Sequence, residues 1–142
     1  MSISNRGSII LILACLAGCA TTYTSSNPSN LPPEQFATVE QVDPIHSGVL
    51  IDHVDGKWHG PRPARLYQLT PGEHSLSARA NLAFYSSNNS EVRWFDAEPG
   101  GQYLIQVLTE PGTGQWGFGI IDRKSGARVD RLWSRNRHPD GA

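Results

Sequence analysis

The chain has 142 residues, of which 38% are hydrophobic, and this is enough for one soluble domain with its own core. Its 12 basic and 13 acidic residues give a net charge of −1, which argues against a general nucleic-acid binder. Both cysteines, Cys15 and Cys19, lie near the N terminus, so the rest of the chain has no disulfide to hold a fold.

Residues 1–18 have the pattern of a secretory signal. The segment MSISNRG carries one basic residue and no acidic residue, and the apolar run SIILILACLAG follows it. This run is shorter than the roughly 20 predominantly apolar residues that a transmembrane helix needs. We therefore expect residues 1–18 to be cleaved off and not to span a membrane.

The tetrapeptide Leu16-Ala17-Gly18-Cys19 resembles the lipobox of bacterial lipoproteins. In that family the signal is cut before the cysteine, which then carries a diacylglycerol on its sulfur and an acyl chain on its new amino group. The resemblance implies a cell-envelope protein held in a membrane by lipid on Cys19, with its domain facing the periplasm. Ala20, by analogy with enteric sorting, favours the outer membrane. An ordinary signal peptide with a leftover cysteine is the alternative.

Residues 19–35 are predicted to be a flexible tether that begins with the acylated Cys19. The segment is rich in Thr, Ser, Asn and Pro and has no hydrophobic period. A coil of this length would span about 20–24 Å, which would lift the domain off the lipid headgroups.

From residue 36 onward the sequence predicts short strands separated by turns. The first two strands are expected at 36–39 and 48–54, and Asp55-Gly56 closes the second. The prolines of the loop 58–63 exclude a central strand there. A further short strand, 65–69, leads into a Pro-Gly turn.

The clearest alternation runs over residues 74–84 and predicts a half-buried strand. A straight strand of this length would reach about 37 Å, so we expect a bend or bulge near residues 79–81. The residues expected on its inward face are His74, Leu76, Ala78, Ala80, Leu82 and Phe84.

The second half of the chain continues the pattern without helical spacing. A polar loop is predicted at 86–90, and strands follow at 91–97, 103–108, 116–121 and 127–132. Both alternating sets of 103–108 are apolar, so this strand should be central in its sheet. The sum predicts an all-β fold, a single antiparallel β-sandwich of six to eight strands over residues 36–133, and a disordered tail over 134–142.

The order of the turns resembles that of the PEGA-like β-sandwich domains of small bacterial envelope lipoproteins. The matching segments, at 54–57, 67–74, 98–107 and 122–126, place the resemblance over roughly residues 38–130. It implies an extracytoplasmic binding or scaffolding module that is not an enzyme. Separately from this resemblance, we expect no cofactor.

Two surfaces are candidates for binding. Trp58, Arg62 and Arg65 lie in an irregular loop, where aromatic and guanidinium groups can stack on sugar rings or pair with carboxylates. This predicts an envelope protein or an anionic polysaccharide as the partner. The C-terminal end is locally basic and could meet anionic polymers or lipid headgroups, through Arg123, Lys124, Arg128, Arg131, Arg135 and Arg137. The alternatives are that Trp58 covers the core and that the tail is a frayed, solvated end.

Catalytic and metal sites are weaker candidates. Residues 112–117 (GTGQWG) fit G-x-G-x-x-G, but a strand pattern follows them where a dinucleotide site needs a helix, so a hairpin loop is expected. The alternatives that stay open are an envelope hydrolase with an acid pair and a metal-binding sensor. The acids considered are Asp52, Asp55, Glu91, Asp96 and Glu98, and the histidines are His53 and His59. We expect no enzymatic activity.

Overall fold

The computed structural model describes residues 22–27, 29–44, 48–60, 63–82, 85–109 and 115–132. Within these ranges ten strands form two five-stranded sheets, and the one helical element is the 3₁₀ turn η1, Pro33–Gln35. The predicted all-β sandwich is confirmed. Seven strands have four residues or more, which agrees with the six to eight predicted, and the other three have two or three residues.

The first sheet runs in the order β1 (Thr22–Thr24), β5 (Leu66–Leu69), β2 (Ala37–Glu40), β8 (Gln102–Thr109) and β9 (Trp116–Asp122). β8 lies between β2 and β9, as its two apolar faces predicted. The pairs β1–β5 and β2–β8 are parallel, whereas an antiparallel sandwich was predicted. Side-chain alternation has the same period in both kinds of ladder, so it does not reveal strand direction.

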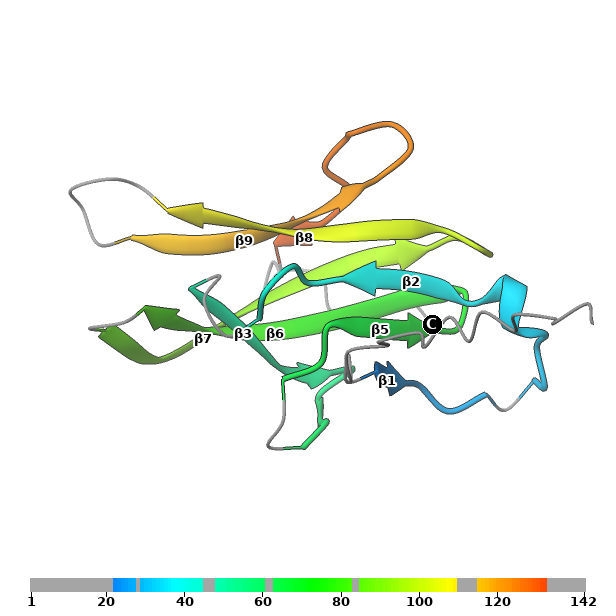
Figure 1. The fold of residues 1–142 in the computed structure, drawn as a ribbon, viewed down its shortest axis with the longest axis horizontal. Helices are drawn as coiled ribbons and strands as arrows, with labels where there is room; N and C mark the ends of the chain where they lie inside the picture. Colours follow the sequence, from blue (N-terminus) through cyan, green and yellow to red (C-terminus); the bar gives the residue numbers. More distant parts are fainter. Residues whose placement is uncertain are drawn as a thin grey trace, which may run out of the picture.

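The second sheet runs in the order β10 (Arg131–Leu132), β7 (Tyr85–Ala97), β6 (Gly72–Leu82), β3 (Val49–Val54) and β4 (Lys57–Trp58), and all its pairs are antiparallel. In Figure 1, β8 and β9 lie above β3, β6 and β7, while β1 and β5 lie toward the lower right. The first two predicted strands therefore belong to different sheets, as β2 and β3.

The long hairpin of β6 and β7 holds one confirmed and one wrong prediction. Its register shifts between Arg79 and Asn81, where a bend or bulge was expected. The polar loop predicted at 86–90 is instead part of β7, since Ser86 pairs with Asn81 and Ser90 with Arg79. Ser and Asn have low strand propensity, but the backbone ladder with β6 overrides that preference.

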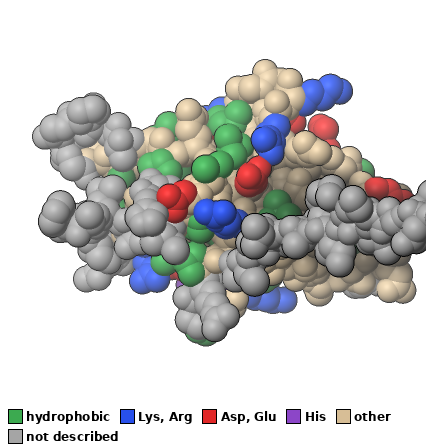
Figure 2. Space-filling model, in the orientation of Figure 1, with side chains coloured by type: hydrophobic (Ala, Val, Ile, Leu, Met, Phe, Trp, Pro, Cys, Tyr) green, Lys and Arg blue, Asp and Glu red, His purple; other side chains and the backbone are tan. Residues whose placement is uncertain are grey.

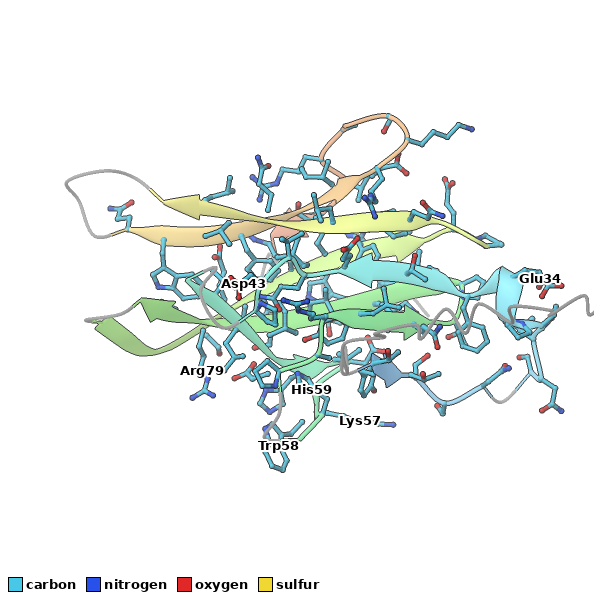
Figure 3. The ribbon with its side chains drawn as sticks, in the orientation of Figure 1. Glu34, Asp43, Lys57, Trp58, His59 and Arg79 are labelled. Carbon is cyan, nitrogen blue, oxygen red and sulfur yellow. The ribbon has the colours of Figure 1, made fainter. Side chains whose placement is uncertain are left out.

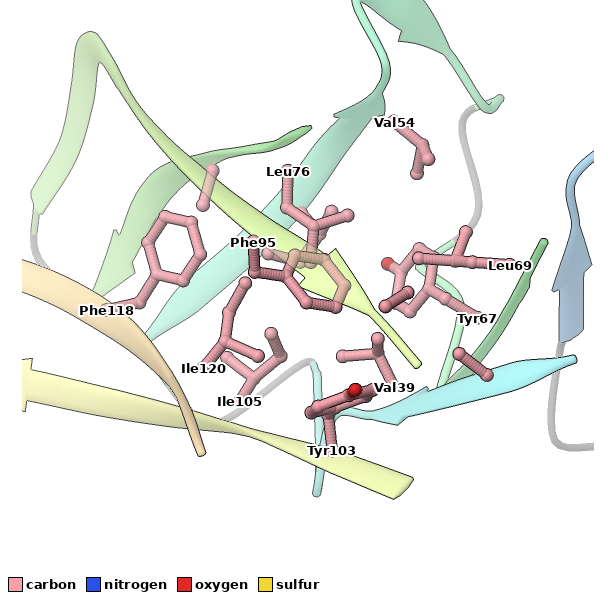
Figure 4. Close-up of a cluster of buried hydrophobic side chains, with 14 of the residues drawn as sticks. Val39, Val54, Tyr67, Leu69, Leu76, Phe95, Tyr103, Ile105, Phe118 and Ile120 are labelled. Carbon is pink, nitrogen blue, oxygen red and sulfur yellow. The ribbon is translucent and has the colours of Figure 1, made fainter. Parts of the chain in front are cut away.

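The core lies between the two sheets, which both contribute to it (Figure 4). On the predicted inward face of β6, His74, Leu76, Ala78 and Ala80 are all buried, which confirms the alternation there. The side chains of Leu82 and Phe84 lie outside the described residues. The largest fully buried side chains are those of Tyr67, Phe95, Phe118, Ile51, Leu69, Leu76 and Ile120.

β1 lies within the segment predicted to be a flexible tether. Its residues 22–24 pair with residues 66–68 of β5, and the backbone N–H of Ser25 donates to the carbonyl of Gln68 over 2.9 Å. Only Ala20 and Thr21 separate Cys19 from this strand, so the tether prediction is corrected for residues 22–24. Polar composition concealed the strand because β1 is an edge strand in which only Tyr23 packs against the core, while the threonines on either side of it are exposed.

The edge of β3 is covered by groups from two other segments. β4 pairs only with His53 and Val54 at the end of β3. Ahead of that point, Gln41 Nε2 donates to the Val49 carbonyl over 2.6 Å, and His59 Nε2 donates to the Ile51 carbonyl over 2.7 Å. These two side chains connect β3 with the segment that follows β2 and with the segment that follows β4.

Candidate functional site

Trp58 is a large exposed side chain at the edge of the second sheet. Its strand β4 follows the two-residue turn Asp55-Gly56, whose φ angles of 52° and 71° are both positive, as a type I′ hairpin turn requires. Trp58 is 61% exposed, so the alternative that it covers the core is wrong. Figure 3 shows Trp58 and its neighbour Lys57 along the lower side of the molecule.

Of the other residues predicted for this loop and for lipid attachment, Arg62, Arg65 and Cys19, the structure describes only Arg65. Arg65 is exposed just before β5, and its carbonyl accepts a hydrogen bond from the backbone N–H of Gln41 over 2.8 Å. Arg62 and Cys19 lie outside the described residues. In the described part of the chain, no hydrogen bond or ring contact joins Trp58 to Arg65.

An aromatic cluster connects β1 with the segment after β4. The ring centroids of Tyr23 and His59 are 5.8 Å apart, those of His59 and Tyr67 are 5.6 Å apart, and those of Tyr23 and Tyr67 are 6.0 Å apart. Burial raises the pKa of both tyrosines. His59 follows Trp58 directly, so this cluster fixes the base of the exposed hairpin beside β1.

A polar cluster lies at the bulge of β3, where the register with β6 shifts between Ile51 and His53. The Asp52 carboxylate is nearly buried, with Oδ1 3.0 Å from His53 Nδ1 and Oδ2 2.9 Å from Arg79 Nε. The His53 and Arg79 side chains are 39% and 46% exposed. The bulge thus places an acid, a histidine and an arginine together at the surface beside β4.

The histidines near this hairpin bind protein groups in the structure. His59 donates to a backbone carbonyl and packs against two tyrosine rings, while His53 contacts Asp52. Within the described ranges, no group of three or more His, Cys, Asp or Glu residues could hold a metal ion.

The buried His74 forms a hydrogen-bonded pair with Asp55, whose side chain is 39% exposed. Its Nδ1 is 2.7 Å from Asp55 Oδ2 and its Nε2 is 2.6 Å from the Thr70 carbonyl oxygen. Because both partners are acceptors, both ring nitrogens donate only when the imidazole is protonated. Burial favours the neutral ring, but the hydrogen bonds to Asp55 and Thr70 outweigh it and raise the pKa of His74 above 6.5. Asp55 also accepts from the Ser75 N–H over 2.9 Å.

The stability of the fold is expected to fall on both sides of a pH window set by this pair. The raised pKa of His74 stabilises the fold below about pH 6.5, and this contribution is lost as the pH rises through the folded-state pKa of His74. Burial alone would raise the pKa of the Asp55 carboxyl, but its hydrogen bonds to His74 and Ser75 have the larger effect, so the pKa is lowered. The contribution of Asp55 to stability is therefore lost as the pH falls through its folded-state pKa. Chemical denaturation across pH measures both slopes.

Two variants separate this pair from other titrating groups. His74→Gln should remove the decrease in the free energy of unfolding at alkaline pH. Asp55→Asn should make that decrease smaller, because the group that accepts from His74 Nδ1 loses its charge. If the wild type and His74→Gln show the same pH dependence above pH 6, the charged pair is not what stabilises this hairpin.

A second buried ionic cluster joins the two sheets at β7 and β9. The side chain of Arg93 is only 7% exposed, pairs with Glu91, and donates from Nε to the Phe118 carbonyl over 3.0 Å. Its Nε also lies 3.7 Å from the fully buried carboxylate of Asp130. Burial opposes the charged form of Asp130, but hydrogen bonds from Arg128 and from the Ile120 N–H outweigh it and lower its pKa.

Two glycines of β9 leave room for this cluster. A Cβ at Gly117 would lie 3.0 Å from Glu91 Oε2, and one at Gly119 would lie 3.1 Å from Arg128 Nε. Gly117 ends the G-x-G-x-x-G match and already belongs to strand β9, which continues to Asp122 where the alternation predicted a strand. In the structure this glycine makes space for a carboxylate of the protein itself.

The predicted basic end is largely paired with acidic side chains. Arg123 Nη1 lies 2.6 Å from Glu40 Oε2, Arg128 Nη2 lies 2.8 Å from Asp130 Oδ2, and Arg131 pairs with Glu73 and with Asp96. Figure 2 shows basic and acidic side chains beside one another on the face that it presents. Arg135 and Arg137 lie outside the described residues. These pairings reduce the positive field that the sequence suggested.

The carboxylates considered for an acid pair have separate surroundings. Asp52 pairs with Arg79, Asp55 with His74, Glu91 with Arg93, and Asp96 with Arg131, while Glu98 lies in an exposed turn. Structural contacts therefore account for four of these five acids.

No protein-family model, curated protein or solved structure matches this chain. Over the residues that the structure describes, no helix is long and apolar enough to cross a bilayer. The function is therefore inferred from the motif at Cys19 and from the geometry of the sandwich.

Proposed function

We propose that this protein is a cell-envelope lipoprotein, held in a membrane by acyl chains on Cys19, whose β-sandwich is a PEGA-like binding or scaffolding module and not an enzyme. The lipobox supports the anchor, and Ala20 favours the outer membrane, with the domain in the periplasm. Two acyl chains or more hold a protein stably, since each buried CH₂ contributes about 0.8 kcal/mol.

The exposure of Trp58 is the observation that carries the binding part of this proposal. Most charged side chains described above are engaged in ion pairs with other side chains of the protein. Trp58, in contrast, presents 61% of its surface to solvent on a short edge strand, next to the exposed Lys57. Tryptophan offers a large, rigid contact area and is enriched among residues that dominate binding. This exposure supports a role in which the surface around Trp58 binds a partner.

Replacing Cys19 with serine is expected to abolish acylation and to release the protein from membranes into the soluble fraction. A serine hydroxyl does not replace the thiol that accepts the lipid. Mass spectrometry of the mature N-terminal peptide and fractionation of cell membranes measure the two effects. Cys15→Ser is the matched control and should leave both unchanged, because Cys15 would leave with the signal. A Cys19→Ser protein that stays in membranes would count against the anchor.

Crosslinking in whole cells, followed by identification of what is attached, tests the module itself. A defined envelope component bound to the wild-type protein supports binding or scaffolding. Attachment of a substrate that the protein alters would instead favour the hydrolase alternative.

A further inference from the structure

We infer that Trp58, Lys57 and Arg65 form a surface that rests on the lipid headgroups of the membrane carrying Cys19. This inference rests on the proposed function, because it requires the lipid anchor, and it names the lipid surface as the partner of Trp58. It follows from the position of β1, from the contact between β1 and the Trp58 hairpin, and from the chemistry of the three side chains.

The covalent chain holds the sandwich close to its anchor. Thr22 is the third residue after Cys19, and an extended chain spans at most about 3.3–3.6 Å per residue, so the two lie within about 11 Å of one another. The headgroup layer of one leaflet is itself roughly 5–8 Å thick. The start of β1 is therefore confined to the membrane surface, and the sandwich has no long linker at this point.

The contacts of β1 determine which part of the sandwich is brought to that surface. Thr22 is the register partner of Leu66, which directly follows Arg65. The ring of Tyr23 lies 5.8 Å from that of His59, which directly follows Trp58. Arg65 and the Trp58 hairpin are thus the neighbours of the strand that the anchor enters. In Figure 3, Trp58, Lys57 and His59 lie together on the lower side of the molecule.

The chemistry of these side chains suits a lipid surface. Tryptophan is enriched at membrane–water interfaces, where its amphipathic ring sits at headgroup level. Lysine and arginine are attracted to anionic lipids within a Debye length of the surface. Trp58 is 61% exposed, and Lys57 and Arg65 are both exposed. A polysaccharide could also stack on the indole, but the short connection to Cys19 favours lipid.

The test uses the acylated mature protein, purified from membranes and reconstituted into vesicles of phosphatidylethanolamine and phosphatidylglycerol, with or without bromine on the acyl chains. Bromine quenches tryptophan fluorescence at short range. We expect brominated vesicles to quench the tryptophan fluorescence of the wild-type protein. Most of this quenching should be absent in Trp58→Phe. Trp116→Phe, which removes an indole from β9 in the other sheet, should retain it. Equal quenching of the wild type and Trp58→Phe would overturn the inference.

A photoreactive amino acid at position 58 gives a second measurement in whole cells. Attachment to lipid supports the contact, whereas attachment to a protein or a polysaccharide overturns it in favour of that class of partner. Acylation of Cys19 is measured on the same samples. A chain without acyl groups would refute the proposed anchor, but an acylated chain with an unquenched Trp58 would refute only the lipid contact.

Discussion

Replacing Arg93 with alanine is expected to lower the free energy of unfolding by about 3–5 kcal/mol, the usual cost of removing one partner from a buried ion pair. The guanidinium neutralises Glu91, lies near the buried Asp130 and donates to the Phe118 carbonyl of the opposite sheet. It also lies 5.9 Å from the centroid of the Phe118 ring. Without it, Glu91 loses its partner and the link between β7 and β9 is lost. Urea denaturation of the purified protein measures the change.

Arg131→Ala is the matched control for this effect. Arg131 also pairs with two carboxylates, those of Glu73 and Asp96, but its side chain is 40% exposed and both acids are more exposed still. Exposed ion pairs contribute only about 0–1 kcal/mol. Similar losses for Arg93→Ala and Arg131→Ala would show that burial does not set the strength of these pairs. The double variant Arg93→Met, Glu91→Gln should recover part of the lost stability, because removing both charges leaves neither position 91 nor position 93 with a charge that lacks its partner.

Replacing Leu76 with alanine is expected to cost about 2–5 kcal/mol of stability, because the substitution leaves a cavity between the sheets. Leu76 is completely buried at the middle of β6 and belongs to the cluster of apolar residues from both sheets. Thermal and urea unfolding of the variant measure the loss.

Ser77→Ala provides the comparison from the next position along the same strand. Ser77 pairs with His53 and Val92 and is only partly buried, so its replacement should change the free energy of unfolding little. Equal and small effects at Leu76 and Ser77 would remove the case that β6 has one inward face.

The features of the fold that could be predicted are those encoded over a few neighbouring residues. The alternation in β6 and the Asp55-Gly56 turn depend on side-chain period and on positive φ, which local sequence specifies. The parallel pairing of β1 with β5 depends on residues more than forty positions apart, and β1 has only one aromatic residue to mark it. The strand at 86–90 likewise follows from its partner β6 and not from its own composition.

The candidate site was predictable to a similar extent. Proline-rich surroundings correctly predicted that Trp58 is not in a central strand, but Trp58 lies in the edge strand β4 and not in the predicted loop. The alternation of β6 correctly placed His74 on the inward face. The contact between Asp52 and Arg79 was not predictable, because it requires the register of β3 on β6 and the bulge within it. Arg93 was also missed, since a charged residue on an alternating strand is normally assigned to the solvent face.

The hydrogen bonds that Gln41 and His59 donate to carbonyls at the outer edge of β3 matter where many copies of the protein are close together on a membrane surface. A bare strand margin offers its hydrogen-bonding groups to any extended peptide, and so templates the growth of aggregates. Copies held in one leaflet by the proposed lipid on Cys19 would meet one another far more often than copies in free solution. With those acceptors already occupied from within the same molecule, this margin is protected against polymerisation from one copy to the next.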